Sequence, residues 1–213
     1  MSKTLYRAVK RICDFGIALI LWILLSPILL LISILVKLTT KGPLFAPNCK
    51  RLYKFRPFSM YKFRTMYSEC DDILDEDPIL KDVLKNNHKI PLDEDIRVTK
   101  VGKLLRKTDV DELPQLINVI IGNMSLVGPR PYMIWEIEDI INGDDDKLKE
   151  DMRLIQKIKP GLTGLWQVSG RNTLNFEQRV QIDAMYAKNR SLLLDLKILL
   201  ETPLILITGR GRK

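Results

Sequence analysis

The sequence predicts a mainly α-helical (α+β) monotopic membrane protein with a small β-hairpin and one re-entrant, proline-kinked helix. Residues 15–36 carry no charged side chain, and a helical pattern runs from Asn175 onward. Residues 58–64 instead alternate between polar and apolar side chains, as short strands do. We therefore expect a membrane helix within residues 1–37, followed by one cytosolic domain at residues 38–213 whose C-terminal helices lie at the membrane interface.

The first expected element is the apolar run at residues 15–36. As a straight helix it would reach about 33 Å, enough to cross a hydrocarbon core of about 30 Å. Ser26-Pro27 interrupts the run near its middle. Cations flank both ends, with Lys3, Arg7, Lys10 and Arg11 before it and Lys37, Lys41, Lys50 and Arg51 after it. Because cations in short flanks favour the cytoplasmic side, we expect both ends on that side, as in a helix that enters one leaflet and returns.

Two other interpretations of this run are a kinked helix that spans the bilayer and a signal peptide. The signal peptide is disfavoured because the run is longer than a signal h-region and no small-residue cleavage site follows in residues 37–43. The re-entrant path requires that the carbonyl freed by Pro27 be satisfied locally, for which the Ser26 hydroxyl is available.

Aromatic and proline residues are frequent in residues 42–66, which we expect to contain the hairpin. Lys62 and Arg64 would then project from the same face of a strand. Near the other end of the chain, residues 191–207 concentrate Leu and Ile beside the basic tail GRGRK at 209–213. That helix could be a core helix or an interfacial one, and the basic tail favours contact with a lipid surface.

Composition restricts the class of partner. The chain of 213 residues has a net charge of +8 and a pI of about 9.4, which implies anionic partners. No nucleic-acid partner is expected, because the sequence has no zinc finger, helix-turn-helix or aromatic-basic sheet signature. Cys13, Cys49 and Cys70 lack the spacing of zinc ligands or of a disulfide framework and are expected to be reduced. The single histidine, His88, lies in a polar loop, which argues against Ser-His-Asp catalysis.

One segment combines an acidic pair with cations, a mixture suited to chemistry on a phosphate ester. Asp111 and Glu112 follow Arg106, and Pro114 fits only the first turn of a helix. We therefore expect the carboxylates at a helix N-terminus, where the helix dipole keeps a carboxylate ionised and attracts phosphate. The alternative is that Asp109 or Asp111 is only an N-cap, with Asp109 and Glu112 spaced as a capping box.

Two further segments rich in glycine and proline supply cations. Arg130 lies between Pro129 and Pro131 after a glycine, so its backbone is nearly fixed and its guanidinium is presented from a rigid turn. Residues 159–172 contain three glycines, the last directly before Arg171. A fixed guanidinium and glycine-rich turns both suit an anion, although ordinary loop structure around the tryptophan would also explain the second segment.

Taken in order, these segments resemble the bacterial sugar transferase family, the monotopic phosphoglycosyl transferases (polyprenyl-phosphate glycosyl-1-phosphate transferases). The resemblance covers almost the whole chain. The matching segments are residues 10–14 with the following apolar run and its Ser26-Pro27, YKFRTM at 61–66, TDVDELPQLINV at 108–119, SLVGPRP at 125–131, KPGLTGLWQVSGRN at 159–172 and LLLDLK at 192–197. The family moves a sugar 1-phosphate from a nucleotide sugar onto polyprenyl phosphate.

The resemblance implies a role for each matching residue. Asp111 would be the catalytic nucleophile and Glu112 the second catalytic acid, as ligand of Mg²⁺. Phosphates would be held by Lys62, Arg106, Arg130 and Arg171, in a pocket shaped by Pro129 and Pro131. The resemblance also implies a UDP-sugar donor, an undecaprenyl (polyprenyl) phosphate acceptor, a covalent phosphosugar-Asp intermediate and release of UMP. Such an enzyme would initiate a membrane glycan pathway on the cytoplasmic face of the bacterial inner membrane, in contact with its lipid, and a homo-oligomer is compatible with the sequence.

The chain departs from the family pattern at two places. Asn123 stands where family members usually carry an acid, and PNCKR at 47–51 replaces a Gln-x-Arg-x-x-Gly stretch. These departures bear on the charge near the metal and on the loop after Phe45, and not on the acidic pair.

Two rival functions remain open at this point. A non-catalytic membrane scaffold of a glycan assembly complex would need the basic flanks but not the clustered acids and arginines. A nucleic-acid-binding protein with a membrane anchor is supported only by the net charge. Residue spacing does not indicate which sugar is transferred.

Overall fold

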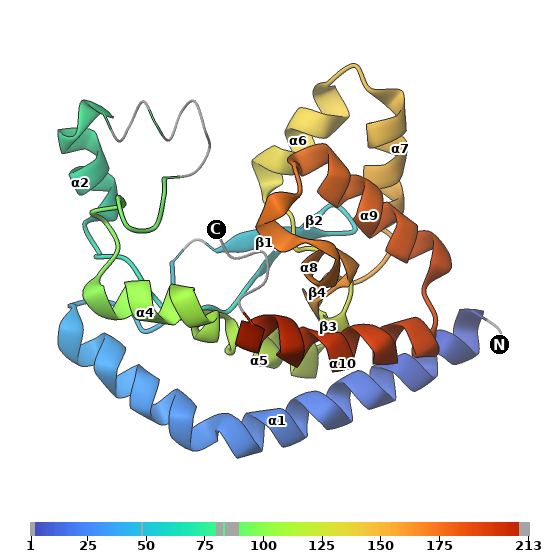
Figure 1. Cartoon of the computed structure of the whole chain (residues 1–213), viewed down its shortest axis with the longest axis horizontal. Helices are drawn as coiled ribbons and strands as arrows, with labels where there is room; N and C mark the ends of the chain where they lie inside the picture. The colour runs from blue at the N-terminus through green and yellow to red at the C-terminus, as the bar shows by residue number, and fades with distance from the viewer. Residues whose placement is uncertain (1–2, 48, 80–82, 84–89, 209–213) are drawn as a thin grey trace. The chain divides into compact units, whose positions relative to one another are not determined.

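The computed structural model describes residues 3–47, 49–79, 83 and 90–208 (Figure 1). His88, Asn48 and the basic tail at 209–213 lie outside these residues. The described chain is mostly helical with a β-hairpin, as predicted for the fold class. It forms two compact units. Unit 1 consists of Met1–Leu24, Cys49–Met60 and Gln115–Lys213, and unit 2 of Leu25–Asn48 and Tyr61–Pro114. The predicted division after residue 37 stays a prediction.

The N-terminal helix α1 runs from Lys3 to Thr39 and contains Pro27. Within the described residues, the stretch Thr4–Thr39 is the one helix long and apolar enough to cross a membrane. Many of its large apolar side chains are exposed, such as Leu24 at 68 % and Leu30 at 63 %. Exposed apolar surface on this scale is unfavourable in water, so α1 supports membrane association. The re-entrant path of this helix stays a prediction.

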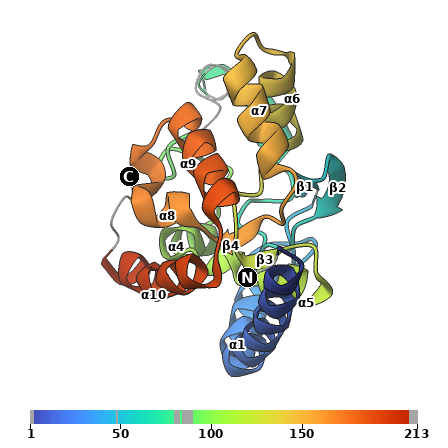
Figure 2. The ribbon, with the colours of Figure 1, turned by 90° about the vertical axis from the view of Figure 1, so that its right-hand side faces the viewer.

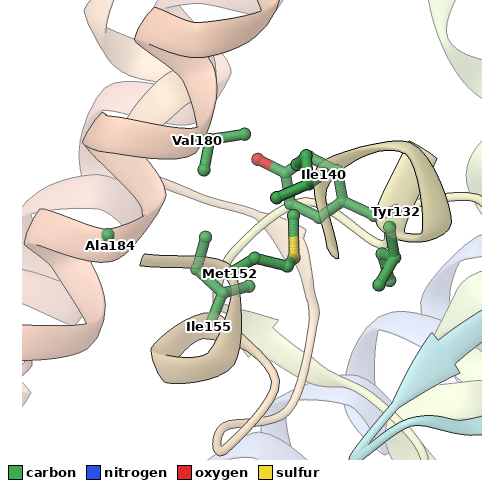
Figure 3. Close-up of a cluster of buried hydrophobic side chains, with 7 residues drawn as sticks. Tyr132, Ile140, Met152, Ile155, Val180 and Ala184 are labelled. Atoms are coloured by element: carbon green, nitrogen blue, oxygen red, sulfur yellow. The ribbon is translucent and has the colours of Figure 1, made fainter. Parts of the chain in front are cut away.

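Three helices of unit 1 pack around one hydrophobic core: α6 (Ile134–Asn142), α7 (Asp146–Ile155) and α9 (Phe176–Asn189). Figure 3 shows their apolar side chains converging. The buried members are Tyr132, Ile137, Ile140, Met152, Ile155, Val180 and Ala184. Capping fixes where two of the helices begin. Asp145 accepts a hydrogen bond from the Leu148 amide at 2.9 Å, and Asn175 forms a reciprocal capping box with Gln178.

The predicted hairpin is present as β1 (Lys50–Tyr53) paired antiparallel with β2 (Arg56–Ser59). Lys54 and Phe55 link the strands, and both have positive φ angles (53° and 57°) as a two-residue type I′ turn requires. Gln156 stabilises this strained turn, because its backbone carbonyl and side-chain Oε1 accept hydrogen bonds from the two turn amides, both at 3.2 Å.

The alternating segment at residues 58–64 continues past the end of β2. Lys62 and Arg64 therefore lie beyond the strand on which they were expected, in an extended stretch of unit 2 joined to Phe45 by an isolated bridge at Phe63. They have separate partners. Arg64 donates to the carbonyl of Thr40 at 2.8 Å, whereas Lys62 contacts the acidic pair described below.

A second, parallel pair of strands was not predicted. β3 (Ser125–Val127) pairs with β4 (Gly161–Thr163), and their backbones continue in contact where the Gly128 amide donates to Thr163 at 2.9 Å. A Cβ on Gly128 would lie 2.5 Å from the carbonyl oxygen of Lys159, so only glycine permits this approach. The two glycine-containing motifs recognised separately in the sequence are thus neighbours in unit 1.

Buried polar contacts tie the first half of α1 to the rest of unit 1. Asp195 of α10 (Leu192–Thr208) accepts a hydrogen bond from the Tyr6 hydroxyl at 2.9 Å and lies 3.0 Å from Lys10 Nζ. Asp14 accepts from the Ser125 hydroxyl at 2.6 Å. Because these buried carboxylates have hydrogen-bonded or ionic partners, the network stabilises one particular packing of α1 against unit 1.

Helix α10 is both a core helix and an exposed one. Its buried side carries Asp195 and Ile198, while Leu193 and Leu200 are 78 % and 66 % exposed. Figures 1 and 2 show α10 running beside the body of unit 1, close to α8 (Leu165–Ser169). The two interpretations offered for this helix from the sequence, a core helix and an interfacial helix, are therefore compatible: one side is buried and the other is exposed.

Unit 2 contains α2 (Cys70–Glu76), α4 (Lys100–Thr108) and the 3-10 turn η1 (Val110–Glu112). Thr99 caps α4 by accepting from the Gly102 amide at 2.8 Å. The backbone of α4 passes close to the extended segment that follows Lys62, because Gly102 faces the carbonyl of Thr65 without an intervening side chain. This contact places Arg106 of α4 within hydrogen-bonding reach of Thr65 Oγ1, at 2.8 Å.

We expect Gly102→Ala to destabilise unit 2. The added Cβ would lie 2.0 Å from the Thr65 carbonyl oxygen, so α4 would have to move away. Overpacking of this kind typically lowers the free energy of unfolding by about 1–3 kcal/mol, measurable by urea unfolding in detergent. Gly16→Ala is the matched control, because a Cβ there meets nothing within 4 Å and alanine favours a helix. Equal stability of the two variants would contradict the assignment of Gly102 to close packing.

Candidate functional site

The acidic pair lies on the 3-10 turn η1, and one lysine contacts both of its carboxylates. Lys62 Nζ lies 2.9 Å from Asp111 Oδ2 and 2.9 Å from Glu112 Oε1. The two acids differ in environment, because the side chain of Asp111 is 2 % exposed and that of Glu112 is 41 % exposed. Lys62 is thus brought together in unit 2 with an acidic pair about 50 positions further along the chain.

Local backbone geometry fixes this arrangement. Asp109 ends α4 in the left-handed conformation (φ 56°, ψ 13°), which Asp tolerates better than most residues, and the chain then turns through η1. The Phe63 amide donates to the backbone carbonyl of Asp111 at 2.9 Å, which holds the residue next to Lys62 against the acidic pair. The side chain of Asp109 makes no cap hydrogen bond to η1, so the capping-box interpretation is wrong.

The position of the acids also differs from the sequence expectation. They precede α5 (Gln115–Ile121) in a separate 3-10 turn and do not occupy its first turn, which is where Pro114 had suggested a helix N-terminus. The charge of Asp111 is therefore compensated by cationic side chains, and Lys62 makes the larger contribution.

Burial is the largest influence on Asp111 and raises the pKa of its carboxyl above the usual value. Lys62 and Arg106 oppose this shift, and the neighbouring Glu112 adds to it. Burial alone would lower the pKa of Lys62, but attraction by Glu112 and Asp111 outweighs burial and holds the pKa above its usual value. Lys62 therefore stays charged.

Asp111 Oδ2 is buried, and within the described residues it accepts no hydrogen bond. Lys62 Nζ lies 2.9 Å from this oxygen and forms an ion pair with it. The oxygen is therefore charge-compensated by Lys62. An oxygen in this state can act as a nucleophile or as a ligand of a cation.

Arg106 is the fourth predicted residue in this group. Its Nε donates to Thr65 Oγ1 at 2.8 Å. Burial lowers the pKa of its guanidinium, and Asp111 and Asp95 oppose that change. An arginine buried near two carboxylates keeps its charge, so Arg106 adds to the positive field at Asp111.

The remaining predicted residues, Pro129, Arg130, Pro131 and Arg171, belong to unit 1. Arg130 follows β3, and its backbone amide donates to Asp183 Oδ2 at 3.0 Å. Its guanidinium lies 3.6 Å from Glu136 Oε1 and 5.7 Å from the centre of the Trp166 ring. Arg171 begins the 3-10 turn η2 (Arg171–Thr173) with a left-handed φ of 53°.

Asp183 is a structural partner that sequence reasoning missed. It is fully buried in α9, and the Tyr132 hydroxyl also donates to its Oδ2 at 2.8 Å. Burial raises the pKa of Asp183 to about 7, although the Arg130 amide and the Tyr132 hydroxyl oppose the shift. By accepting hydrogen bonds from the Arg130 backbone amide and the Tyr132 side-chain hydroxyl, on either side of Pro131, Asp183 fixes the turn that presents Arg130.

The two departures from the family pattern fall in connecting segments. Asn123 lies between α5 and β3, where its amide donates to the carbonyl of Asn118 at 2.9 Å. The other segment leads into β1, which begins at Lys50. Their effect on the metal and on the loop after Phe45 stays a prediction.

The acidic pair is compatible with Mg²⁺. No group of three or more His, Cys, Asp or Glu side chains with metal-binding geometry occurs in the described part of the chain. Mg²⁺ nonetheless commonly binds through one or two carboxylates together with substrate phosphates and water. The half-exposed carboxylate of Glu112 and the buried carboxylate of Asp111 provide such a pair of oxygen ligands.

The sequence is similar to a known protein family and to several bacterial proteins. The model of the family described as "Bacterial sugar transferase" matches residues 5–209. The exopolysaccharide production protein ExoY of Sinorhizobium fredii is 40 % identical over 206 residues, covering 95 % of this chain and 87 % of that protein.

Two longer relatives have names that state a reaction. The undecaprenyl-phosphate galactose phosphotransferase of Salmonella typhimurium is 37 % identical over 216 residues, or 99 % of this chain and 43 % of that protein. The UDP-glucose:undecaprenyl-phosphate glucose-1-phosphate transferase of Klebsiella pneumoniae is 39 % identical over 198 residues, or 91 % and 39 %. The chain spans less than half the length of these two relatives.

Proposed function

The chain belongs to the bacterial sugar transferase family, and we propose that it transfers a sugar 1-phosphate from a UDP-sugar to undecaprenyl phosphate, with release of UMP. This reaction would initiate a membrane glycan pathway. The names of the Salmonella and Klebsiella relatives support the substrate class. The observation that carries the proposal is the buried, charge-compensated Asp111, whose Oδ2 accepts no hydrogen bond from the described residues.

The proposed reaction has two displacements at one phosphorus atom. An Asp111 carboxylate oxygen attacks the phosphorus that bears the sugar, the bond from that phosphorus to the bridging oxygen breaks, and UMP leaves. An oxygen of undecaprenyl phosphate then attacks the same phosphorus and the bond to Asp111 breaks. The carboxylate is regenerated and the product is a sugar diphosphate lipid.

The contrast between the two acids supports a division of roles. A nucleophile benefits from a dry, fixed position, and Asp111 is almost fully buried next to Lys62. Glu112 is 41 % exposed, with one oxygen bonded to Lys62 at 2.9 Å, and suits a ligand that meets a cation arriving with the donor. Lys62 and Arg106 would compensate negative charge at the acidic pair, while Arg130 and Arg171 would bind phosphate oxygens.

Mg²⁺ is the proposed cofactor, held by Glu112. When bound, it would neutralise charge on the diphosphate of the donor. Lys62 would keep the Glu112 side chain oriented toward the acidic pair, because it bonds Oε1 at 2.9 Å and also contacts Asp111.

We further propose that α1 enters one leaflet and returns, with the domain on the cytoplasmic face of the inner membrane. Cations flank both ends of the apolar run, and Pro27 interrupts the helical hydrogen bonds inside it. The exposed leucines of α10 support an additional interfacial contact. Such an arrangement would bring a soluble donor and a lipid acceptor to one surface.

Purified protein supplied with undecaprenyl phosphate and a panel of UDP-sugars should release UMP from at least one donor. Asp111→Asn should reduce the rate more than about 1,000-fold, because an amide is a poor nucleophile. Asp109→Asn is the matched control and should keep its activity, since Asn also accepts the left-handed conformation. Absence of UMP with every donor, or substantial turnover by Asp111→Asn, would contradict the proposal.

Glu112→Gln tests the metal role. We expect the Mg²⁺ concentration for half-maximal activity to rise about 10-fold, because a neutral amide oxygen is a weaker ligand than a carboxylate. Magnesium titrations of UMP release measure this quantity. Glu94→Gln, an exposed acid of unit 2, is the control. An unchanged titration for Glu112→Gln would remove Glu112 from the metal site.

Cysteine labelling tests the path of α1. In a variant without the three native cysteines, Lys3→Cys and Lys41→Cys should both react only with reagent that reaches the cytoplasm. Pro27→Ala restores the helical hydrogen bonds and should give a mixed population, because the cationic N-terminus resists crossing. If Lys3→Cys, in the protein that keeps Pro27, is labelled from the opposite side of the membrane, the helix spans the bilayer.

A further inference from the structure

Two arginines of unit 1 lie against the same tryptophan. The Arg130 and Arg179 guanidinium carbons are 5.7 and 5.8 Å from the centre of the Trp166 ring, and Arg179 is also 5.8 Å from the ring of Phe176. The residues come from three elements: the turn after β3, helix α8 and helix α9. An arginine stacked on an aromatic face leaves its in-plane N–H groups directed away from the ring, which suits an anion.

The charges of this cluster are incompletely balanced. Arg130 has Glu136 as an ionic partner at 3.6 Å. For Arg179, no ion pair is found among the residues that the structure describes. Burial lowers the pKa of the Arg179 guanidinium, and the nearby charge of Arg130 lowers it further. The charges of Glu136 and Asp183 oppose these two effects on Arg179, although neither acid forms an ion pair with it in the described part of the chain. Two guanidinium groups that share one aromatic ring and one ion-paired acid are placed to attract a further anion.

Buried donors in the same cluster lack acceptors. Arg179 Nε and Trp166 Nε1 are both buried and have no hydrogen-bond partner in the described structure. Two acids, Glu136 and Asp183, are close enough for their charges to act on Arg179. Asp183 uses its Oδ2 for the Arg130 amide and the Tyr132 hydroxyl, and its Oδ1 has no hydrogen-bond partner in the described structure. A buried N–H without an acceptor is unfavourable, and a bound oxyanion would relieve both.

We propose that Arg179 is a further phosphate-binding residue, acting with Arg130 and the indole N–H of Trp166 on one phosphate group of a substrate. The side chain of Arg130 is 24 % exposed, so the cluster reaches solvent at that residue. This inference rests on the proposed function for the identity of the substrate. The phosphate could belong to the UDP-sugar or to undecaprenyl phosphate, and the experiment separates these two sources.

The first measurement needs no turnover. Binding of pyrophosphate to the full-length protein in detergent is measured by calorimetry for the parent, Arg179→Met and Trp166→Phe. We expect Arg179→Met to weaken binding at least about 10-fold, and Trp166→Phe, which keeps a ring but loses the N–H, about 3-fold or more. Arg179→Lys should restore part of the affinity. Arg153→Met, which removes an exposed arginine of α7, is the control and should bind as the parent does.

The second measurement assigns the phosphate. The KM values for both substrates are compared between Arg179→Met and the parent protein. A higher KM for the UDP-sugar alone would mean that Arg179 binds a phosphate of the donor. A higher KM for undecaprenyl phosphate alone would mean that Arg179 binds the lipid phosphate. If no variant turns over any donor but Arg179→Met still loses pyrophosphate binding, the phosphate site stands and the proposed function fails. Unchanged pyrophosphate binding and unchanged KM values in Arg179→Met would overturn the inference. If Arg179→Met does not fold, Trp166→Phe and Arg179→Lys decide by the same criteria.

Discussion

The arrangement of unit 2 depends on a single ammonium group between two carboxylates. Without Lys62, Asp111 would be a buried acid beside a second acid, and both burial and repulsion would favour its protonated form. Lys62, at 2.9 Å from each carboxylate, opposes this shift of the Asp111 pKa. The next residue, Phe63, also binds the backbone of Asp111, so one segment supplies both the charge and the position. The chemistry proposed for Asp111 is a consequence of this contact.

Unit 1 presents its cations by a different means. Gly128 allows β3 and β4 to approach so closely that the turn containing Arg130 has little conformational freedom. The Arg130 amide also donates a hydrogen bond to the buried Asp183. Arg130 is thus held by backbone geometry as well as by the counter-charge of Glu136. Preorganised groups of this kind lose little entropy when a phosphate binds. Arg179 is held differently, against the rings of Trp166 and Phe176 and with no ion pair among the described residues, which makes it the candidate for a further ligand contact.

Features carried by residue type and local order could be predicted from the sequence, whereas tertiary pairing could not. The apolar helix, the hairpin and the acidic pair each have a local signal. The Lys62 contact joins residues 50 positions apart, and the Asp183 contact to Arg130 joins residues 53 apart, so neither has a periodic pattern. The type I′ turn was missed because Lys54 and Phe55 replace the usual Asn-Gly. The turn is stabilised by Gln156, which lies about 100 residues further along the chain. β3 and β4 are too short for a recognisable strand pattern.

The central claim, that Asp111 becomes covalently phosphorylated by the sugar phosphate, has a direct test. The protein is incubated with an active UDP-sugar and Mg²⁺ in the absence of undecaprenyl phosphate, and its intact mass is recorded. The account predicts release of about one UMP per protein and a mass increase equal to one sugar phosphate, located at Asp111 and removed by hydroxylamine as expected for an acyl phosphate. UMP release that strictly requires the lipid phosphate, with no adduct at any residue, would contradict it.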